Sequence, residues 1–333
     1  MEEAKQIVLD IKKGLIKPVY FLMGEESYYI DKIAGFIEKS VLSEEERGFN
    51  QVVLYGKDVT IDDIVANAKR YPMMAERQVV IVKEAQHLSR TIDNLSSYVD
   101  NPQPTTVLVI CYKYNKLDKR KKLYKSVQAN GVLFESKKLY ENQVSDWIRK
   151  NLQGKGYSIS HKAAILLVEF LGTDLNRINN ELEKLQLVLP KETEITPVLI
   201  EEHIGISKDY NNFELKKAIG ERNITKATRI ITYFSQNPKD NPFVVTITLL
   251  HTFFTQLLKY HGLNDHSPKS VASALRINPY FVGEFQTAAK NYPMKKVSGI
   301  VSHLREMDVK GKGVGATNIS QADLLKELLV KIL

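Results

Sequence analysis

Residues 71–82 read YPMMAERQVVIV, and this stretch joins the end of a helix to a buried strand. Pro72 restricts the residue before it to extended conformations, so the preceding helical pattern is expected to stop there. The β-branched run Val79–Val82 is apolar on both faces, which is typical of an interior strand of a parallel sheet. The connector between the two elements carries three large apolar residues, Tyr71, Met73 and Met74.

Strands and helices alternate on both sides of this stretch, as far as residue 140. Strands are also predicted at four short runs rich in β-branched and other apolar residues: Val19–Met23, Val52–Tyr55, Thr106–Cys111 and Val132–Glu135. Apolar residues recur at helical spacing in 29–41, and Thr60 forms a capping box with Asp63 at the start of another helix. Further helices are expected at Ile92–Val99 and, with a basic sequence, at about Leu117–Ala129. This alternation predicts an α/β domain whose parallel sheet is wrapped by helices.

After Tyr140 only helices are expected. Ser160 is a capping residue for one that closes at Gly172, where glycine suits the left-handed closing position. The polar run 208–212 interrupts the pattern and is interpreted as a linker, and Ser320 caps the last helix. We therefore expect an α/β domain, a small helical domain and a larger helical domain, at residues 1–140, 141–207 and 208–333.

Charge and cysteine content restrict the class of protein. The 333 residues carry a formal net charge of +8 and the pI is about 9.1, which indicates a polyanionic neighbour. The one cysteine, Cys111, lies in a predicted strand and is expected to be buried and inert; a reducing, cytosolic compartment fits. The sequence has no signal-peptide pattern. Its longest apolar run, Phe243–Leu258, is interrupted by polar residues, so no membrane span is expected.

No catalytic or metal site is expected. One cysteine cannot form a Cys-rich zinc module, and His261 and His266 are separated by a predicted loop. No nucleophile elbow or HExxH motif is present. Three aspartates raise the alternative of a metal-dependent nuclease, but capping explains Asp63, and loop solvation explains Asp58 and Asp62.

The loop after the first predicted strand lacks the residues that hold nucleotide phosphates. A phosphate loop needs glycines, whose N–H groups cradle the phosphates, and a lysine that reaches the outer ones. Here the loop reads GEESYYI from Gly24, so a tyrosine and an isoleucine stand where the second glycine and the lysine belong. Glu25 and Glu26 would each repel a phosphate by about 1–4 kcal/mol at ~4 Å. Lys83 also replaces the aspartate that would hold magnesium. Nucleotide hydrolysis and a bound cofactor are therefore not expected.

A basic segment, residues 113–125, holds seven basic residues and one acid, with Tyr114 and Tyr124 among them and Tyr112 directly before. Such a surface could track a phosphate backbone, with tyrosine stacking in addition. Equally, it fits a solvated helix face whose tyrosines pack inward, and the sequence leaves both interpretations open. A second basic stretch, KGKG, is expected to be a flexible turn before the last helix. The candidate DNA contacts are Lys119, Arg120, Lys121, Lys122, Lys310 and Lys312.

The connector at residues 71–74 is the best candidate for a protein-binding element. Methionine side chains are unbranched and polarizable, which suits an adaptable contact surface. From the residues alone, however, packing beneath the core is favoured over exposure, because large apolar side chains next to a buried strand more often face inward.

A set of short motifs lies in order along essentially the whole chain. They are VYFLMGEE at 19–26, Phe49-Asn50, AKRYPMMAERQ at 68–78, NKLDKRKKL at 115–123, GTDL at 172–175, NELEKL at 180–185, Val271–Phe285 and Lys310-Gly311. In their order and spacing these motifs resemble the delta subunit of the bacterial replicative DNA polymerase clamp loader.

This resemblance implies an AAA+-like fold without ATPase activity, a small helical middle domain, and a helical collar domain used for oligomerisation. It implies a place in a pentameric loader beside ATP-hydrolysing gamma/tau subunits and a delta-prime subunit. The chain has no phosphate loop, zinc cysteines or Ser-Arg-Cys finger, which favours delta over those siblings.

In the family, delta grips the ring-shaped sliding clamp (beta subunit) and opens one interface for loading onto primer–template DNA. The grip uses apolar residues just before the third strand, which here are Tyr71, Met73 and Met74. Met73-Met74 stands where the family often has leucine followed by phenylalanine. With the resemblance counted, exposure of these side chains is expected.

Two other functions remain open at the level of sequence. A nucleotide-dependent enzyme with an unorthodox phosphate site would bind ATP as the isolated chain. A DNA-binding scaffold of a replication or repair complex, without clamp contact, would bind DNA with a steep salt dependence. Changes at Met73 or Met74 would not affect that binding.

Overall fold

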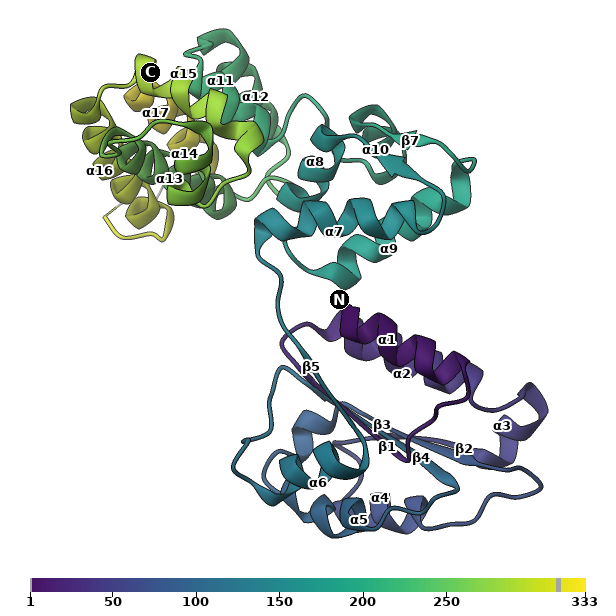
Figure 1. Ribbon diagram of the computed structural model, residues 1–333. Helices are drawn as coiled ribbons and strands as arrows, with labels where there is room; N and C mark the ends of the chain where they lie inside the picture. Colours follow the sequence, from purple (N-terminus) through teal and green to yellow (C-terminus); the bar gives the residue numbers. More distant parts are fainter. Residues whose placement is uncertain (1, 316–318) are drawn as a thin grey trace. The chain divides into compact units, whose positions relative to one another are not determined.

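The protein is known from a computed structural model that describes residues 2–315 and 319–333 (Figure 1). The chain forms two compact units that divide between Leu139 and Tyr140. The further division of the second unit at residues 207/208 stays a prediction.

A five-stranded parallel sheet lies at the centre of the first unit. Its strands follow the order β2-β3-β4-β1-β5, so the chain crosses the sheet through helices rather than hairpins. All five strands expected from the sequence are present: β1 (Val19–Gly24), β2 (Gln51–Tyr55), β3 (Gln78–Lys83), β4 (Thr106–Lys113) and β5 (Val132–Ser136). In the register, Leu22 of β1 is opposite Cys111 of β4 and Phe134 of β5.

Helices cover both faces of this sheet (Figure 1). One face carries α1 (Glu2–Lys12) and α2 (Ser27–Ser40), and the other carries α4 (Ile61–Ala68), α5 (Ser96–Asp100) and α6 (Lys122–Asn130). Alternate residues of β1 divide between the two layers: Phe21 and Met23 join the core beneath α4–α6, whereas Leu22 is buried outside that core. Burial on both faces explains the unbroken apolar runs of the central strands and confirms the expected α/β class, a parallel sheet wrapped by helices.

Local signals placed the helix starts well in some segments and poorly in others. The capping box of Thr60 and Asp63 is present at the start of α4. The basic helix expected from residue 117 begins only at Lys122, because the Asp118 carboxylate accepts hydrogen bonds from the backbone and guanidinium of Arg120 and holds a turn. The expected helix at 92–99 is a 3₁₀ turn, Ile92–Leu95, followed by the short α5.

The first part of the second unit contains α7 (Glu141–Gln153), α8 (His161–Leu171), α9 (Leu175–Val188) and α10 (Pro197–Ile204). Ser160 caps α8 as expected, and Gly172 ends it with φ 74°. The expectation of helices alone is wrong here, because β6 (Ser158–Ile159) pairs in parallel with β7 (Glu194–Ile195). Two-residue strands are too short to show a period of two in the sequence.

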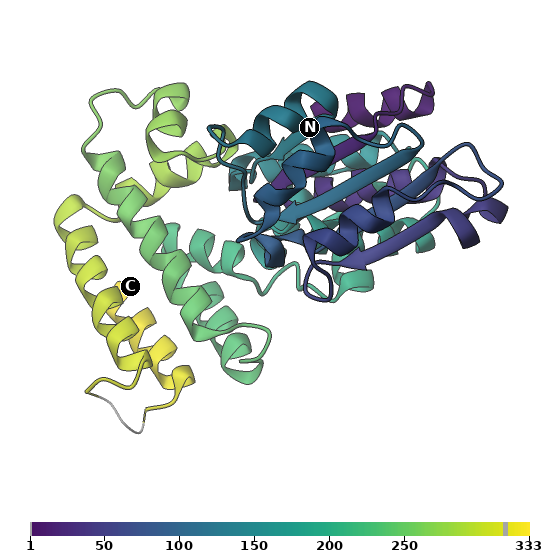
Figure 2. The same cartoon turned by 90° about the horizontal axis from the view of Figure 1, so that it is seen from below.

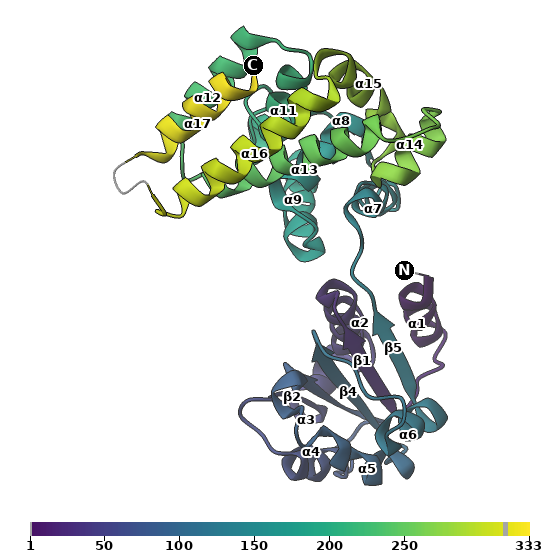
Figure 3. The same cartoon turned by 90° about the vertical axis from the view of Figure 1, so that its left-hand side faces the viewer.

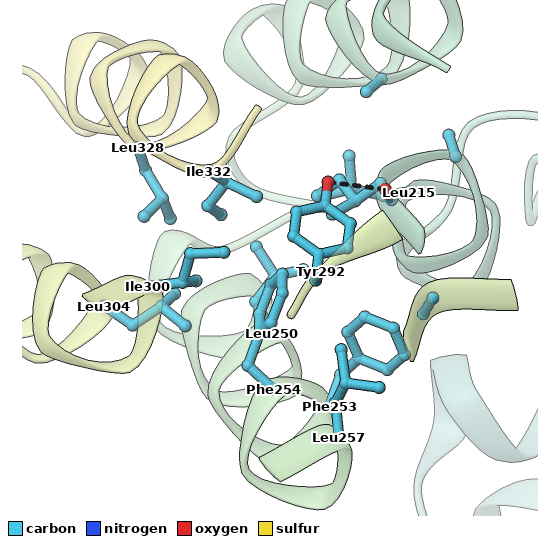
Figure 4. Close-up of a cluster of buried hydrophobic side chains, with 14 of the residues drawn as sticks. Leu215, Leu250, Phe253, Phe254, Leu257, Tyr292, Ile300, Leu304, Leu328 and Ile332 are labelled. Atoms are coloured by element: carbon cyan, nitrogen blue, oxygen red, sulfur yellow. Dashed lines mark hydrogen bonds between the residues drawn. The ribbon is translucent and has the colours of Figure 1, made fainter. Parts of the chain in front are cut away.

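The remaining helices enclose one large apolar core. They are α11 (Asn212–Gly220), α12 (Ile224–Gln236), α13 (Phe243–His261), α14 (Pro268–Leu275), α15 (Val282–Asn291), α16 (Met294–Gly311) and α17 (Gln321–Ile332), with a 3₁₀ turn at Pro279–Phe281. Figure 2 shows α13 alongside α16, and Figure 3 shows α12 beside α17. Tyr292 lies at the centre of the core (Figure 4), where its hydroxyl donates to the Ile219 carbonyl at 2.8 Å.

Helix α13 is the one element among the described residues with the length and apolar composition of a membrane-crossing helix. Its inward side chains, including Leu250, Phe254 and Leu257, are buried in this core (Figure 4). A central core helix has the same composition, so the apolar run is explained by packing within the unit.

Candidate functional site

The connector between α4 and β3 carries its large apolar side chains on the surface of the first unit. The exposed fraction is 77% for Tyr71, 56% for Met73 and 103% for Met74. The inward packing favoured by the residues alone is therefore wrong, and the exposure expected from the family resemblance is what the structure shows. Large apolar groups that lie together in water are a common mark of a contact surface.

Asn50, the last residue of α3 (Glu44–Asn50), holds the backbone of this connector. Its Oδ1 accepts a hydrogen bond from the Met73 N–H at 2.6 Å, and its Nδ2 donates to the Met73 carbonyl at 2.9 Å. The same Nδ2 also donates to the Glu46 carbonyl at 3.1 Å. Asn50 is only 3% exposed, so its buried amide holds one residue of the connector in place.

Gln78, the first residue of β3, anchors the beginning of the connector. Its Nε2 donates to the Arg70 carbonyl at 2.5 Å and to Thr106 Oγ1 at 2.8 Å. The Ala68 carbonyl at the end of α4 accepts from Thr106 Oγ1 at 2.8 Å and from the Tyr98 hydroxyl at 3.2 Å. These bonds satisfy carbonyls that the end of a helix leaves without partners.

Met74 has a positive φ of 54°, which is uncommon for a residue other than glycine. The connector thus combines an unusual backbone conformation with full exposure of the side chain. A backbone in a sparsely populated region persists only where its surroundings determine it. Here Asn50 and Gln78 fix the backbone on either side of Tyr71 by hydrogen bonds to Met73 and Arg70.

Sequence reasoning missed the roles of Asn50 and Gln78. Each is a buried amide beside an apolar run: Asn50 follows Phe49 and precedes β2, and Gln78 opens β3. A polar residue at the boundary of a buried strand is a usable signal, but the partner 23 residues away cannot be read from one sequence. Phe49, the residue before Asn50, is 74% exposed.

The place where a phosphate loop would lie is closed by the protein's own backbone. Gly24 has φ +124°, and a Cβ there would lie 2.0 Å from the Ser136 carbonyl oxygen. Its N–H donates to the Asn115 carbonyl at 3.0 Å, and the Glu25 N–H donates to the Ser136 carbonyl at 3.0 Å. The glycine is needed for the approach of β5, and these two N–H groups are already engaged.

The protein's own charged side chains fill the rest of this edge. The Glu26 carboxylate, 5% exposed, caps α2 by accepting from the Tyr28 N–H at 3.1 Å. Lys113 Nζ, at the end of β4, lies 2.8 Å from Asp31 and 3.3 Å from Glu84. Burial opposes the charged form of Lys113, but its hydrogen bonds with Asp31 and Glu84 raise its pKa. Lys113 is thus already paired with two carboxylates, and the net negative charge of these three groups disfavours a nucleotide phosphate.

Cys111 lies in β4 next to this network and is fully buried. Burial raises the pKa of its thiol to about 12, so it is a neutral packing residue rather than a nucleophile. Within residues 2–315 and 319–333, no group of three or more His, Cys, Asp or Glu side chains has a metal-binding arrangement.

Most of the candidate DNA-contacting residues are engaged in ion pairs inside the chain. Arg120 pairs with Asp118 at 2.7 Å, Lys121 with Asp93, and Lys122 with Asp100 at 2.7 Å. Of the four residues 119–122, Lys119 alone has no described ion pair. Tyr112 is buried, Tyr124 is half-buried, and only Tyr114 is exposed. These contacts favour a solvated face over a phosphate track.

The lysines of the second basic stretch are also paired, and the expected turn is confined to Lys312 and Gly313, because Lys310 and Gly311 still belong to α16. Lys310 lies in the last turn of α16, where it contacts Glu306 at 2.8 Å and Glu327 at 3.4 Å. Lys312 contacts Asp308 at 2.6 Å. The i, i+4 pairs of Lys310 with Glu306 and of Lys312 with Asp308 support the end of the helix. A DNA contact at any of these basic residues stays a prediction.

Comparison with known proteins places this geometry in a family. The family model for the DNA polymerase III delta subunit matches residues 20–137, and the model for its C-terminal domain matches residues 209–330. The DNA polymerase III subunit delta of Bacillus subtilis strain 168 is 28% identical over 331 residues, covering 96% of this chain and 94% of that protein. The solved structure of the B. subtilis clamp loader delta protein, YqeN, has a TM-score of 0.59 at 26% identity and 99% coverage of both chains.

Proposed function

The chain belongs to the DNA polymerase III delta-subunit family, and from this premise we propose that it is a non-catalytic clamp-loader subunit that binds the sliding clamp through its connector. The observation that supports the connector as the contact is the exposure of Tyr71, Met73 and Met74 on a backbone held by buried amides.

The energetics of such a contact are favourable. Each large apolar side chain that enters a pocket contributes roughly 1.5–3 kcal/mol. A few adjacent side chains of this kind form a hot spot that dominates the binding energy. Because the connector is already held in one conformation, little additional ordering opposes binding.

Opening of the clamp would follow from differential affinity. If the connector binds better to a ring with one interface sprung than to a closed ring, binding shifts the ring toward the open form. Each tenfold preference for the open ring shifts that equilibrium by about 1.4 kcal/mol. No chemical step by this chain is required.

The energy source is assigned to partner subunits. The edge of the sheet that would bind nucleotide is closed at Gly24, and its Lys113 is already paired with two carboxylates, which supports a division of labour in which gamma/tau subunits hydrolyse ATP. In this proposal the chain works in the cytoplasm beside gamma/tau and delta-prime, and the assembly places the clamp on primer–template DNA. A DNA-binding scaffold without clamp contact is less well supported, since most of the candidate basic residues pair internally.

The decisive experiment measures binding of the purified chain to the sliding clamp of its own organism by calorimetry. We expect Met73→Ala/Met74→Ala to weaken binding by about 100-fold, which corresponds to about 2.7 kcal/mol. Met294→Ala is the matched control, because Met294 is 51% exposed at the start of α16 in the other unit. It should bind as the wild type does.

Each result bears on a different part of the proposal. Undiminished binding by a folded Met73→Ala/Met74→Ala variant would move the clamp contact elsewhere. A wild-type chain that fails to bind the clamp both alone and with its loader partners would contradict the proposed function.

A further inference from the structure

The connector presents exposed apolar side chains without the backbone freedom that usually accompanies a surface loop. Both polar groups of the Met73 backbone are bound by the side chain of Asn50. We infer that Asn50 is a positioning residue for the proposed clamp contact: it fixes the Met73 backbone so that Met73 and Met74 are presented ready to bind. This inference rests on the proposed function and adds a determinant that does not itself touch the clamp.

The chemistry of the site requires an amide. One side chain must accept a hydrogen bond from the Met73 N–H and donate one to the Met73 carbonyl, and the second hydrogen of Nδ2 goes to the Glu46 carbonyl. Asparagine has one such acceptor and two such donors at this length. An ionised carboxylate only accepts, and a glutamine is one methylene too long for the same backbone.

Burial makes these bonds matter. Asn50 is 3% exposed, so water does not readily replace an amide that is removed. Met74 follows directly with its φ of 54°, a conformation that Met73 must lead into. Without the hydrogen bonds of Asn50, the connector would sample other conformations. The apparent affinity for the sliding clamp would then fall in proportion to the fraction of molecules in the binding-ready conformation.

The test compares Asn50→Ala with wild type in two measurements: affinity for the sliding clamp, and hydrogen exchange of the Met73 amide. We expect affinity to fall by about tenfold and the Met73 amide to exchange faster, because its acceptor is gone. Asn67→Ala is the matched control, since Asn67 is a half-buried asparagine whose Nδ2 donates within its own helix to the Asp63 carbonyl at 2.8 Å and does not bond to the connector. Its clamp affinity should equal that of wild type.

A second variant separates positioning from folding. In Asn50→Asp the introduced carboxyl regains a donor only when protonated, so its affinity relative to wild type should recover as pH is lowered from 7 to 5. The folded fraction of Asn50→Asp is measured by circular dichroism over the same pH range, because in a purely structural defect the affinity would recover only in proportion to the folded fraction. This series also decides the case in which Asn50→Ala fails to fold.

The results distinguish this inference from the proposed function. If Asn50→Ala binds like wild type while Met73→Ala/Met74→Ala does not, the positioning role is overturned and the clamp contact stands. If the loss of affinity equals the loss of folded protein, or Asn50→Asp shows no recovery at lower pH, the positioning role is also overturned. If Met73→Ala/Met74→Ala binds normally, the proposed contact itself fails.

Discussion

Two regions of the first unit use similar residues in opposite ways. At the carboxyl edge of the sheet, Lys113 is paired with both Asp31 and Glu84, and Gly24 is covered by β5. In the connector between α4 and β3, the polar groups are satisfied by Asn50 and Gln78 instead. There the apolar side chains are left in water.

The difference shows where a partner can add free energy. A charge or N–H that already has a partner inside the protein offers little to a ligand, because binding would exchange one contact for another. An exposed methionine on a fixed backbone still has its hydrophobic transfer free energy to gain. The fold thus closes the edge at which other open α/β sheets bind ligands. It leaves the apolar side chains of the connector exposed to a partner.

The largest effect is expected from Gly24→Ala, which tests whether the edge is closed by packing. The substituted Cβ would lie 2.0 Å from the Ser136 carbonyl, at a φ of +124°. We expect the free energy of unfolding, measured in urea, to fall by about 3 kcal/mol or more. A glycine retained only for approach of a nucleotide would tolerate alanine without loss of stability.

Gly35→Ala is the matched control for that measurement. Gly35 lies inside α2, and a Cβ there meets nothing within 4 Å. Alanine is a better helix former than glycine by about 1 kcal/mol, so this variant should be more stable than wild type. If the free energy of unfolding falls in Gly24→Ala and rises in Gly35→Ala, the loss at Gly24 comes from closure of the edge and not from a general effect of replacing glycine.

A smaller effect is expected from Glu84→Gln, which tests the ion pair between Glu84 and Lys113 at this edge. Burial opposes ionisation of Glu84, but hydrogen bonds from Gln86 and Lys113 and the charge of Lys113 lower its pKa. A lowered pKa in the folded state stabilises the protein above the unfolded pKa of about 4.3, and that contribution is lost as pH falls through the folded value.

Glutamine cannot ionise, so wild type should exceed Glu84→Gln in free energy of unfolding at pH 7 and lose that advantage in acid. Because the Glu84 side chain is 38% exposed, we expect a difference below about 1 kcal/mol at pH 7. Clamp affinity should not change, since the connector depends on amide and apolar groups. A difference in stability that persists unchanged at pH 3 would contradict the assignment.

The smallest effect concerns DNA. Lys119 and Lys125 are exposed and have no ion pair among the described residues, whereas Lys121 and Lys122 do. We expect Lys119→Ala/Lys125→Ala to reduce the salt dependence of primer–template binding by a slope of about 2, and Lys121→Ala/Lys122→Ala to reduce it less. Fluorescence anisotropy over a range of salt concentrations measures both. Equal slopes in the two variants would show that the internal pairs do not limit contact with DNA.

Much of the sheet was predictable because burial leaves a strong mark on the sequence. The runs in the three central strands β1, β3 and β4 are buried on both faces, and the structure places all five predicted runs in strands, although the edge strands β2 and β5 are only partly buried. Caps at Thr60, Ser160 and Ser320 were predictable for a similar reason, since each capping bond lies within a few residues of chain.

The rest depended on contacts that sequence spacing does not record. The bond between Asn50 and Met73 spans 23 residues, and the ion pair between Lys121 and Asp93 spans 28. The first holds the connector outward, and the second neutralises a residue that looked free to bind DNA. The apolar side chain of Met74 by itself favours a buried position. Its exposure could be expected only from the family resemblance.

The backbone at Met74 also restricts how this position can vary among related chains. At a φ of 54° a side chain branched at Cβ, such as valine or isoleucine, would meet its own backbone. Methionine, leucine and phenylalanine are not branched at Cβ and all avoid that crowding. An apolar residue at position 74 is therefore free to change in length and shape to match a diverging partner, provided that its branch point stays beyond Cβ.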